Sequence, residues 1–344
     1  MPKGIDAVFV GSSDNKLYAI NAKTGTKLWD FATKGTVHSS PTLAMGLVIV
    51  GSSDQNIYAL DIKTGAKAWE FPLEMNISSA PLVNNGVVYV GMGNTASFTT
   101  KLYALDVVTG AKKWEFTADG QSLSSPTIVN GKVYIGGFIN VYALDAKKGT
   151  TLWEFATTAG VDSSPAVANG VVYIGSNDYN VYAIDAETGT KKWNYTTGGE
   201  VSSSPTVIDG QVLVGSFDRK LYALNAQTGT KVWEFKTDGP VLASPTASNG
   251  VVYTASNDLK LYALDAKTGA KKWESWATNR IQSSPVVTDS LAYVGSLDGK
   301  LYAIDIQSGN KKWTFQTGGS IYSSPAVINS AAQTFFPSVS GLQQ

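Results

Sequence analysis

His38 is the only histidine in this chain of 344 residues, and the chain has no cysteine. Mechanisms that need two histidines or a thiolate are therefore excluded, as are thiolate metal sites and disulfides. A single loop histidine is more often a hydrogen-bonding group than a catalytic base. Arg219 and Arg280 are the only arginines. Either could hold a carboxylate or a sulfate, although an ordinary solvated arginine is the commoner case.

Carboxylates are the remaining groups that could bind a metal ion or transfer a proton. Glu74, Asp162 and Glu200 are acids without counterparts elsewhere in the chain, but no metal-ligand spacing links them. Six other acids recur at matching loop positions, so we expect them to cap turns, with a shallow cation site as the alternative. They are Asp14, Asp54, Asp178, Asp218, Asp258 and Asp298.

Charge and composition narrow the class of partner. The 27 basic and 27 acidic residues cancel, so the chain lacks the concentrated positive surface that nucleic-acid binding requires. No apolar run approaches the roughly 18 residues of a membrane span, and the first residues do not have the pattern of a signal peptide. We therefore expect a folded domain with no nucleic-acid partner and no membrane span.

An internal repeat decides the fold. The pair Tyr-Ala recurs eight times at spacings of 39 to 45 residues, and a tryptophan follows each of these tyrosines by eleven residues. A fixed period near forty residues indicates a propeller or a solenoid. The eight tryptophans are Trp29, Trp69, Trp114, Trp153, Trp193, Trp233, Trp273 and Trp313.

Each unit is predicted to contain four short strands. In one copy these are residues 205–208, 211–215, 220–225 and 231–235, separated by Asp-Gly, Ser-Phe-Asp and Thr-Gly turn signals. No helical period occurs. Four-stranded antiparallel units repeated eight times predict an all-β, eight-bladed β-propeller.

The two chain ends are predicted to share one blade. Residues 7–11 match a second strand without a first, and residues 323–328 match a first strand without a second. Pairing them closes the ring and removes a free sheet edge. We therefore expect one propeller domain over residues 1–330, and a C-terminal tail, residues 331–344, that is loosely attached or disordered.

Every unit carries the motif Ala-[Leu/Ile]-[Asp/Asn]-x-x-[Thr/Ser/Lys]-Gly-x-x-x-Trp, as in Ala104 to Trp114. This motif resembles the PQQ-type repeat of quinoprotein dehydrogenases and of BamB-like outer-membrane assembly proteins. The resemblance covers nearly the whole chain and implies the propeller fold, but the family includes enzymes, assembly scaffolds and receptor sensor domains. For the tryptophans we expect packing between blades, because one ligand cannot use eight equivalent sites.

Positions that vary among the copies are candidates for a binding site. The residue three places before each first-strand proline varies, whereas its predecessor is almost always apolar. These variable residues are His38, Ser78, Leu123, Asp162, Ser202, Leu242, Gln282 and Tyr322. They belong to connections between blades and are predicted to surround one mouth of the central channel. The loops between second and third strands, which also vary, should open on the same face.

This face is the predicted binding surface for a protein segment or a small ligand. The candidate site residues are His38, Asp162, Glu200, Arg219, Trp276, Arg280, Gln282 and Tyr322. Trp276 lies outside the tryptophan repeat, and two interpretations of it have equal weight. It is either an exposed aromatic residue that recognises a partner or a side chain that covers the edge of a blade.

A non-catalytic, BamB-like binding scaffold without a cofactor is the favoured function, and we expect a monomer. The family resemblance implies a periplasmic or extracellular location. The alternatives are a dehydrogenase with PQQ and calcium, or a sensor domain detached from a larger receptor. The dehydrogenase is disfavoured because those enzymes are longer and commonly carry a vicinal cysteine pair. Near-identical units are also compatible with a recently amplified or engineered array.

Overall fold

The computed structural model describes residues 5–77, 79–94, 98–120, 123–329 and 334–335. These residues form eight antiparallel sheets and contain no helix. We number the sheets as blades 1 to 8 in chain order. Blade 1 contains β1 (Ala7–Ser12), β2 (Lys16–Asn21), β3 (Lys27–Ala32), β32 (Ala326–Ile328) and β33 (Thr334–Phe335).

The other seven blades each contain four consecutive strands. Blades 2 to 4 are β4 (Thr42–Ala44), β5 (Leu47–Gly51), β6 (Asn56–Asp61) and β7 (Lys67–Pro72); β8 (Leu82–Asn84), β9 (Val87–Asn94), β10 (Thr99–Asp106) and β11 (Lys112–Asp119); and β12 (Thr127–Val129), β13 (Lys132–Gly136), β14 (Asn140–Asp145) and β15 (Thr151–Ala156). Blades 5 and 6 are β16 (Ala166–Ala168), β17 (Val171–Gly175), β18 (Asn180–Asp185) and β19 (Lys191–Thr196); and β20 (Thr206–Ile208), β21 (Gln211–Gly215), β22 (Lys220–Asn225) and β23 (Lys231–Lys236). Blades 7 and 8 are β24 (Thr246–Ser248), β25 (Val251–Ala255), β26 (Lys260–Asp265) and β27 (Lys271–Trp276); and β28 (Val286–Val287), β29 (Leu291–Gly295), β30 (Lys300–Asp305) and β31 (Lys311–Gln316).

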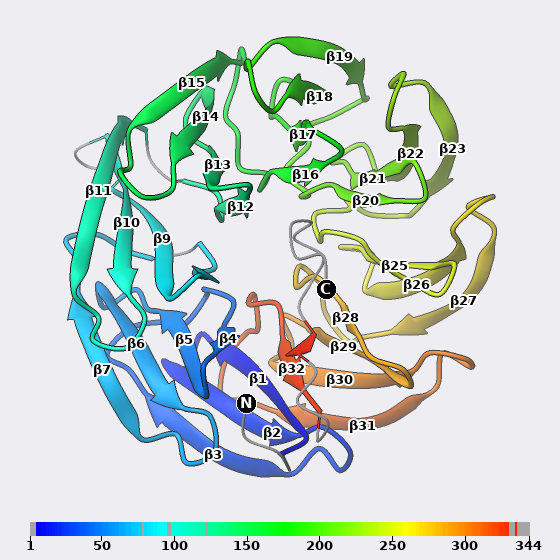
Figure 1. Ribbon diagram of the computed structural model, residues 1–344. Coiled ribbons are helices and arrows are strands. Elements are labelled where there is room, and N and C mark those ends of the chain that lie inside the picture. The colour runs from blue at the N-terminus through cyan, green and yellow to red at the C-terminus, as the bar shows by residue number, and fades with distance from the viewer. Residues whose placement is uncertain (1–4, 78, 95–97, 121–122, 330–333, 336–344) are drawn as a thin grey trace.

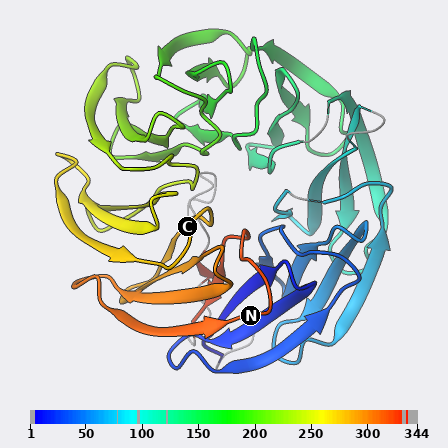
Figure 2. The same ribbon diagram turned by 180° about the vertical axis from the view of Figure 1, so that it is seen from behind.

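The blades stand around a central axis, as both faces of the ring show (Figures 1 and 2). In blades 2 to 8 the first strand lies near the axis and the fourth strand forms the outer rim. In blade 1 the inner strands are β32 and β33, and β3 is the outermost strand. This arrangement confirms the predicted all-β, eight-bladed propeller. The strand bounds within the copy analysed from sequence differ from the prediction by one residue at most.

The ends of the chain meet in blade 1, as predicted. β1 pairs with β2 on one side and with β32 on the other, through Ala7–Ile328, Val8–Val327 and Phe9–Ala326. β33 adds a further strand to the inner edge of β32. Most of the predicted loose tail, residues 331–344, lies outside the described residues.

Burial explains why these short strands are stable. The second and third strands are buried along almost their whole length, because both sides of each sheet pack against neighbouring blades. The outer strands alternate between exposed and partly buried residues, as in β19. Each blade thus contributes apolar side chains to two cores, which the cluster joining Ile49 and Ile57 of blade 2 with Val88 and Tyr103 of blade 3 illustrates.

The repeated tryptophans join each blade to the next. Every indole Nε1 donates a hydrogen bond of 2.9 to 3.3 Å to a backbone carbonyl in the following blade, and Trp313 of blade 8 donates to Ala22 of blade 1. The motif glycine packs against the preceding blade's indole. A Cβ on Gly229 would lie 2.7 Å from the Trp193 ring, and its φ of +73° also favours glycine.

A second ring of contacts, which we call the serine ring, surrounds the axis. The backbone N–H of one residue at the start of each inner segment donates to the serine Oγ at the same position of the next blade. Seven such hydrogen bonds of 2.9 to 3.1 Å connect Ala80 through Ser125, Ser164, Ser204, Ser244, Ser284 and Ser324 to Ser40. The eighth hydrogen bond is missing, because Ala80 has no hydroxyl to accept it from the backbone N–H of Ser40.

Candidate functional site

The predicted binding face consists of two sets of segments that contact one another. One set is the loops between the second and third strands, and the other is the connections between blades. Their backbones are linked, since Phe217 N–H donates to Glu200 O at 2.9 Å and Leu297 N–H donates to Arg280 O at 3.0 Å. We call this side of the ring the loop face.

The recurring aspartates hold the loop face together. Asp178 Oδ2 accepts hydrogen bonds from the Tyr182 hydroxyl at 2.8 Å and from the Thr158 N–H of the preceding connection at 3.1 Å. Burial alone would raise the pKa of Asp178, but these bonds and those from Asn180 hold it below its usual value. Corresponding tyrosine contacts occur at Asp14, Asp54, Asp218, Asp258 and Asp298. These carboxylates therefore cap turns, as predicted.

His38 and Tyr322 lie together where the chain ends meet. Their ring centroids are 4.8 Å apart, and Ser13 Oγ lies 2.9 Å from His38 Nε2. Burial lowers the pKa of His38 below 6.5. The imidazole is therefore mainly neutral at pH 7 and forms part of a contact among three segments.

Arg280 and Gln282 belong to the connection between blades 7 and 8. Arg280 is exposed and its carbonyl accepts the Leu297 N–H, while its side chain has no polar partner among the described residues. Gln282 is half-buried and likewise has no side-chain hydrogen bond there. Among the described residues, neither side chain forms a hydrogen bond or a ring contact with His38 or Tyr322.

Asp162 lies on the opposite side of the ring, between blades 4 and 5. Its Oδ2 accepts a hydrogen bond of 2.8 Å from Asn177 Nδ2, and Ser202 Oγ donates to Asn177 Oδ1 at 3.3 Å. The eight predicted site residues thus share one end of the propeller but do not converge on one point.

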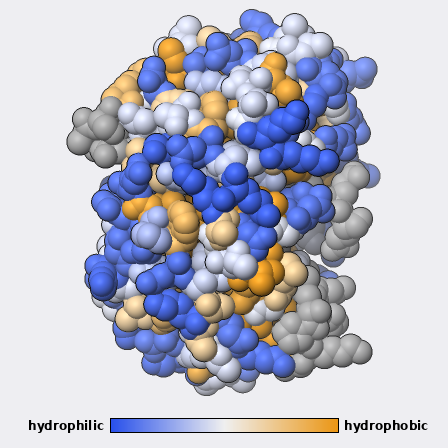
Figure 3. Space-filling view, turned by 60° about the vertical axis from the view of Figure 1, so that its left-hand side comes forward, coloured by the Kyte–Doolittle hydropathy of each residue, from blue (hydrophilic) through white to orange (hydrophobic). Residues whose placement is uncertain are grey.

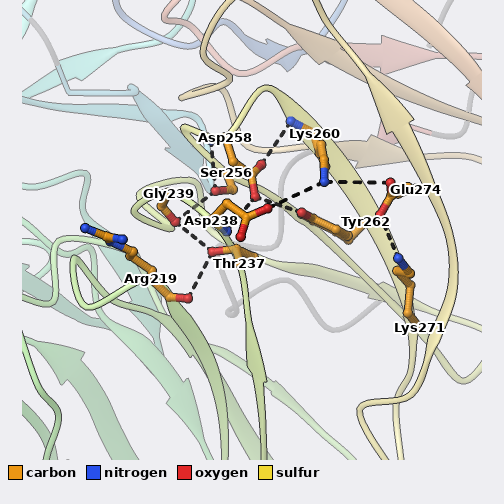
Figure 4. A network of polar contacts seen from close by, with 10 residues as sticks. All are labelled: Arg219, Thr237, Asp238, Gly239, Ser256, Asp258, Lys260, Tyr262, Lys271 and Glu274. Carbon is orange, nitrogen blue, oxygen red and sulfur yellow. Dashed lines mark hydrogen bonds and ion pairs between the residues drawn. The ribbon is translucent and has the colours of Figure 1, made fainter.

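Glu200 belongs to the connection before blade 6, and Arg219 belongs to the loop between the second and third strands of that blade. Arg219 adopts φ +71° in the loop, and its carbonyl accepts the Thr237 N–H at 2.9 Å. Figure 4 shows its guanidinium pointing away from the contacts that join Asp238, Lys260 and Glu274. Among the described residues, neither side chain forms an ion pair.

Trp276 lies at the outer rim rather than at the channel mouth, because it is the last residue of the outermost strand of blade 7. Its side chain is 51% exposed, and Lys260 Nζ lies 4.2 Å from the ring centroid. The lysine covers one face of the indole.

Leu123 corrects the sequence-based alignment of the variable positions. The count back from the proline predicts a variable residue at Leu123. In the structure Leu123 is only 3% exposed and lies beside Gly91, where other blades have their packed Val or Ile. The long β9–β11 strands change the connection in blade 3, so the count back from the proline fails there. Ser78 and Ser122 lie outside the described residues.

An apolar group on the loop face was not among the predicted site residues. Phe98, Phe138, Ile139, Tyr179 and Phe217 occupy the second-to-third-strand loops of four consecutive blades, 3 to 6, and are 36 to 47% exposed. We call these five residues the apolar arc. Phe98 and Phe138 contact each other edge to face at 4.8 Å. The available signal was that Phe138 stands where other loops have the turn-capping aspartate.

The family model described as "Outer membrane protein assembly factor BamB" matches residues 4–95, 72–137, 137–246 and 236–336. The chain therefore belongs to this PQQ-repeat family. A comparison with curated protein sequences gave no match.

Solved structures share the propeller of this PQQ-repeat protein at low sequence identity. BamB from Moraxella catarrhalis is 21% identical with a TM-score of 0.72, over 87% of this chain and 95% of that one. The computationally designed Ika8 protein is 17% identical with a TM-score of 0.76, over 89% and 98%. The quinohemoprotein alcohol dehydrogenase from Comamonas testosteroni is 16% identical with a TM-score of 0.73, over 98% and 75%. These similarities establish the fold alone.

Among the residues that the structure describes, no cluster of acids fits a calcium–quinone centre. Calcium requires several converging oxygen ligands, with carboxylates among them. Within the described residues, no group of three or more histidines and acids is placed to hold a metal ion. The recurring loop aspartates already accept hydrogen bonds from tyrosine hydroxyls and backbone N–H groups.

Proposed function

We propose that this protein is a non-catalytic binding module that takes an apolar segment of another protein on its loop face. The apolar arc carries this proposal. The described residues include twelve exposed large apolar side chains, and five of them lie in the loops of blades 3 to 6. The equivalent loops of blades 1 and 2 carry the polar residues Asn15 and Gln55 instead.

The scaffold supports this use of the loops. Tryptophan contacts and the serine ring hold each blade against its neighbours, so the loops start from fixed positions. A partner that covers the arc would remove aromatic surface from water with little ordering of the module itself. Phenylalanine and tyrosine are typical of the buried centres of protein interfaces. The family's namesake is an assembly factor, which also favours a protein partner.

The arrangement of acids disfavours a quinone-dependent dehydrogenase as the function, because no described cluster offers calcium its ligands. A periplasmic or extracellular site is part of the proposal and is supported by the family description. Among the described residues no helix has the length and apolar character to cross a membrane. A sensor domain of a larger receptor would use the same face and is the second candidate.

Selection from a displayed peptide library tests the proposal. Peptides selected on the unmodified protein should be rich in apolar residues and should lose binding to the triple variant F138S/Y179S/F217S. The double variant L28S/V232S removes two comparably exposed apolar side chains from outer strands and should bind normally. Equal binding to both variants would contradict the proposal. A stoichiometric complex with PQQ and calcium that oxidises alcohols or sugars would replace it with the enzyme alternative.

A further inference from the structure

The outer strand of every blade leaves one backbone edge without a partner strand in the described structure. Such edges attract other strands, and proteins protect them with charged side chains, lysine above all. Seven of the eight outer strands begin with lysine: Lys27, Lys67, Lys112, Lys191, Lys231, Lys271 and Lys311. β15 of blade 4 begins with Thr151 and contains no lysine.

β15 also exposes an apolar side chain on this unprotected strand. Leu152 is 48% exposed. Val232 occupies the same place in β23 and is 49% exposed, but there Lys231 and Lys236 stand at the two ends of the strand. In blade 4 the lysines lie in the preceding turn, at positions 147 and 148. Hydrophilic residues dominate the rim around β7 and β11, with separate apolar patches between them (Figure 3).

Glu154 is an acid without its usual counterion. The acid at this place in the outer strand is paired with a lysine in five blades, for example Glu234 with Lys231 and Lys220, both at 2.8 Å. In blade 4 the first residue of β14 is Asn140 and that of β15 is Thr151, so both lysine positions are lost. Glu154 is exposed and has no ion pair among the described residues.

We infer that the outer edge of β15 is a strand-addition site for an extended segment of another protein that carries lysine or arginine. Backbone hydrogen bonds would extend the sheet of blade 4, as peptides do at other exposed sheet edges. A basic side chain of the segment pairs with Glu154, and an apolar one packs on Leu152. This site is separate from the apolar arc, so it does not depend on the function proposed above.

The probe is a capped hexapeptide, Lys-Thr-Val-Thr-Lys-Thr, which places lysine and valine on one face so that they can meet Glu154 and Leu152 together. Hydrogen exchange over residues 151–156 is the measurement. The peptide should slow exchange there in a saturable way and leave residues 231–236 unchanged. L152K should weaken this binding by about tenfold or more, since it removes the apolar contact and places a positive charge on the edge. V232K, a matched change on β23, should have no effect. An acidic peptide of glutamate and valine should not bind.

Four results would overturn the inference. Equal protection of 151–156 and 231–236 would mean that β15 is not special. Equal binding of a peptide with N-methylated alternate amides would mean that no backbone hydrogen bonds form. A dimer in sedimentation experiments that L152K abolishes would mean that a second copy of this chain occupies the edge. Loss of binding in F138S/Y179S/F217S, with L152K normal, would place the peptide on the apolar arc.

Discussion

The backbone N–H of Ser324 donates a hydrogen bond of 2.9 Å to Ser40 Oγ, which lies 284 positions away in the sequence. This contact joins the strand at the C-terminal end of the ring to the entry of blade 2. It is one of the seven bonds of the serine ring, in which every blade except blade 3 accepts a bond from the preceding blade. The closing blade therefore uses the same polar contact as the blades that follow one another in sequence.

Completing the serine ring should stabilise the protein. Ala80 occupies the position at which the other seven blades have serine. A80S therefore supplies the missing acceptor for the backbone N–H of Ser40. A net gain of about 0.5–1.5 kcal/mol in the free energy of unfolding is expected for one added hydrogen bond. Urea denaturation measures it. S204A, which removes an existing acceptor, should cost about the same amount, and a stabilising S204A would contradict the role of the ring.

Thr254 should be a weak point in the core between blades. Its side chain is fully buried, and its hydroxyl has no hydrogen-bond partner among the described residues. The equivalent residue in all seven other blades is valine or isoleucine, as at Val214. T254V should raise the free energy of unfolding by about 1–3 kcal/mol. Valine has a volume similar to that of threonine and lacks the unpaired buried hydroxyl. V214T is the matched reverse change and should destabilise. Thermal unfolding of the two variants gives the comparison.

Two glycines with the same backbone angle separate strain from packing. Gly210 and Gly229 both have φ +73°, but a Cβ on Gly210 would contact nothing within 4 Å, whereas one on Gly229 would overlap the Trp193 ring. G210A should lose about 1–2 kcal/mol from the left-handed conformation alone. G229A should lose a further 1–3 kcal/mol or so, because the indole must shift. Equal losses in chemical denaturation would show that the tryptophan contact is dispensable.

His38 should make stability depend on pH. Burial lowers its pKa in the folded state below the unfolded value of 6.5, so the unfolded chain binds more protons as the pH falls through that value. The contribution of neutral His38 to the free energy of unfolding is present above pH 6.5 and is lost as the pH falls toward the pKa of His38 in the folded state. Between about pH 7.5 and about pH 5, the denaturation midpoint should fall less steeply in H38Q than in the unmodified protein. Identical slopes would exclude His38 as the titrating group.

The fold was predictable because each copy of the repeat tests the others. One glycine or tyrosine says little, but Tyr18 to Tyr302 with Trp29 to Trp313 at constant spacing defines the blade and its turns. The shared blade followed from one incomplete unit at each end. The strand bounds followed from turn residues such as Asp209-Gly210, which adopt positive φ in the structure.

The site was less predictable, because it depends on departures from the repeat. The sequence located the variable positions but not their contacts, and His38 and Tyr322, which are 284 positions apart in the sequence, prove to be in contact. The failure at Leu123 has the same origin, since one irregular connection shifts the packed position by a residue. The bare edge of β15 is visible only after the eight outer strands are known to be equivalent.

Closure of blade 1 has a consequence for synthesis on the ribosome. β1 to β3 emerge first, yet the inner partner of β1 is β32, which ends at Ile328. The earliest strands therefore wait through translation of the other seven blades with an open inner edge. We therefore expect the inner edge of β1 to stay without its partner strand until β32 has left the exit tunnel.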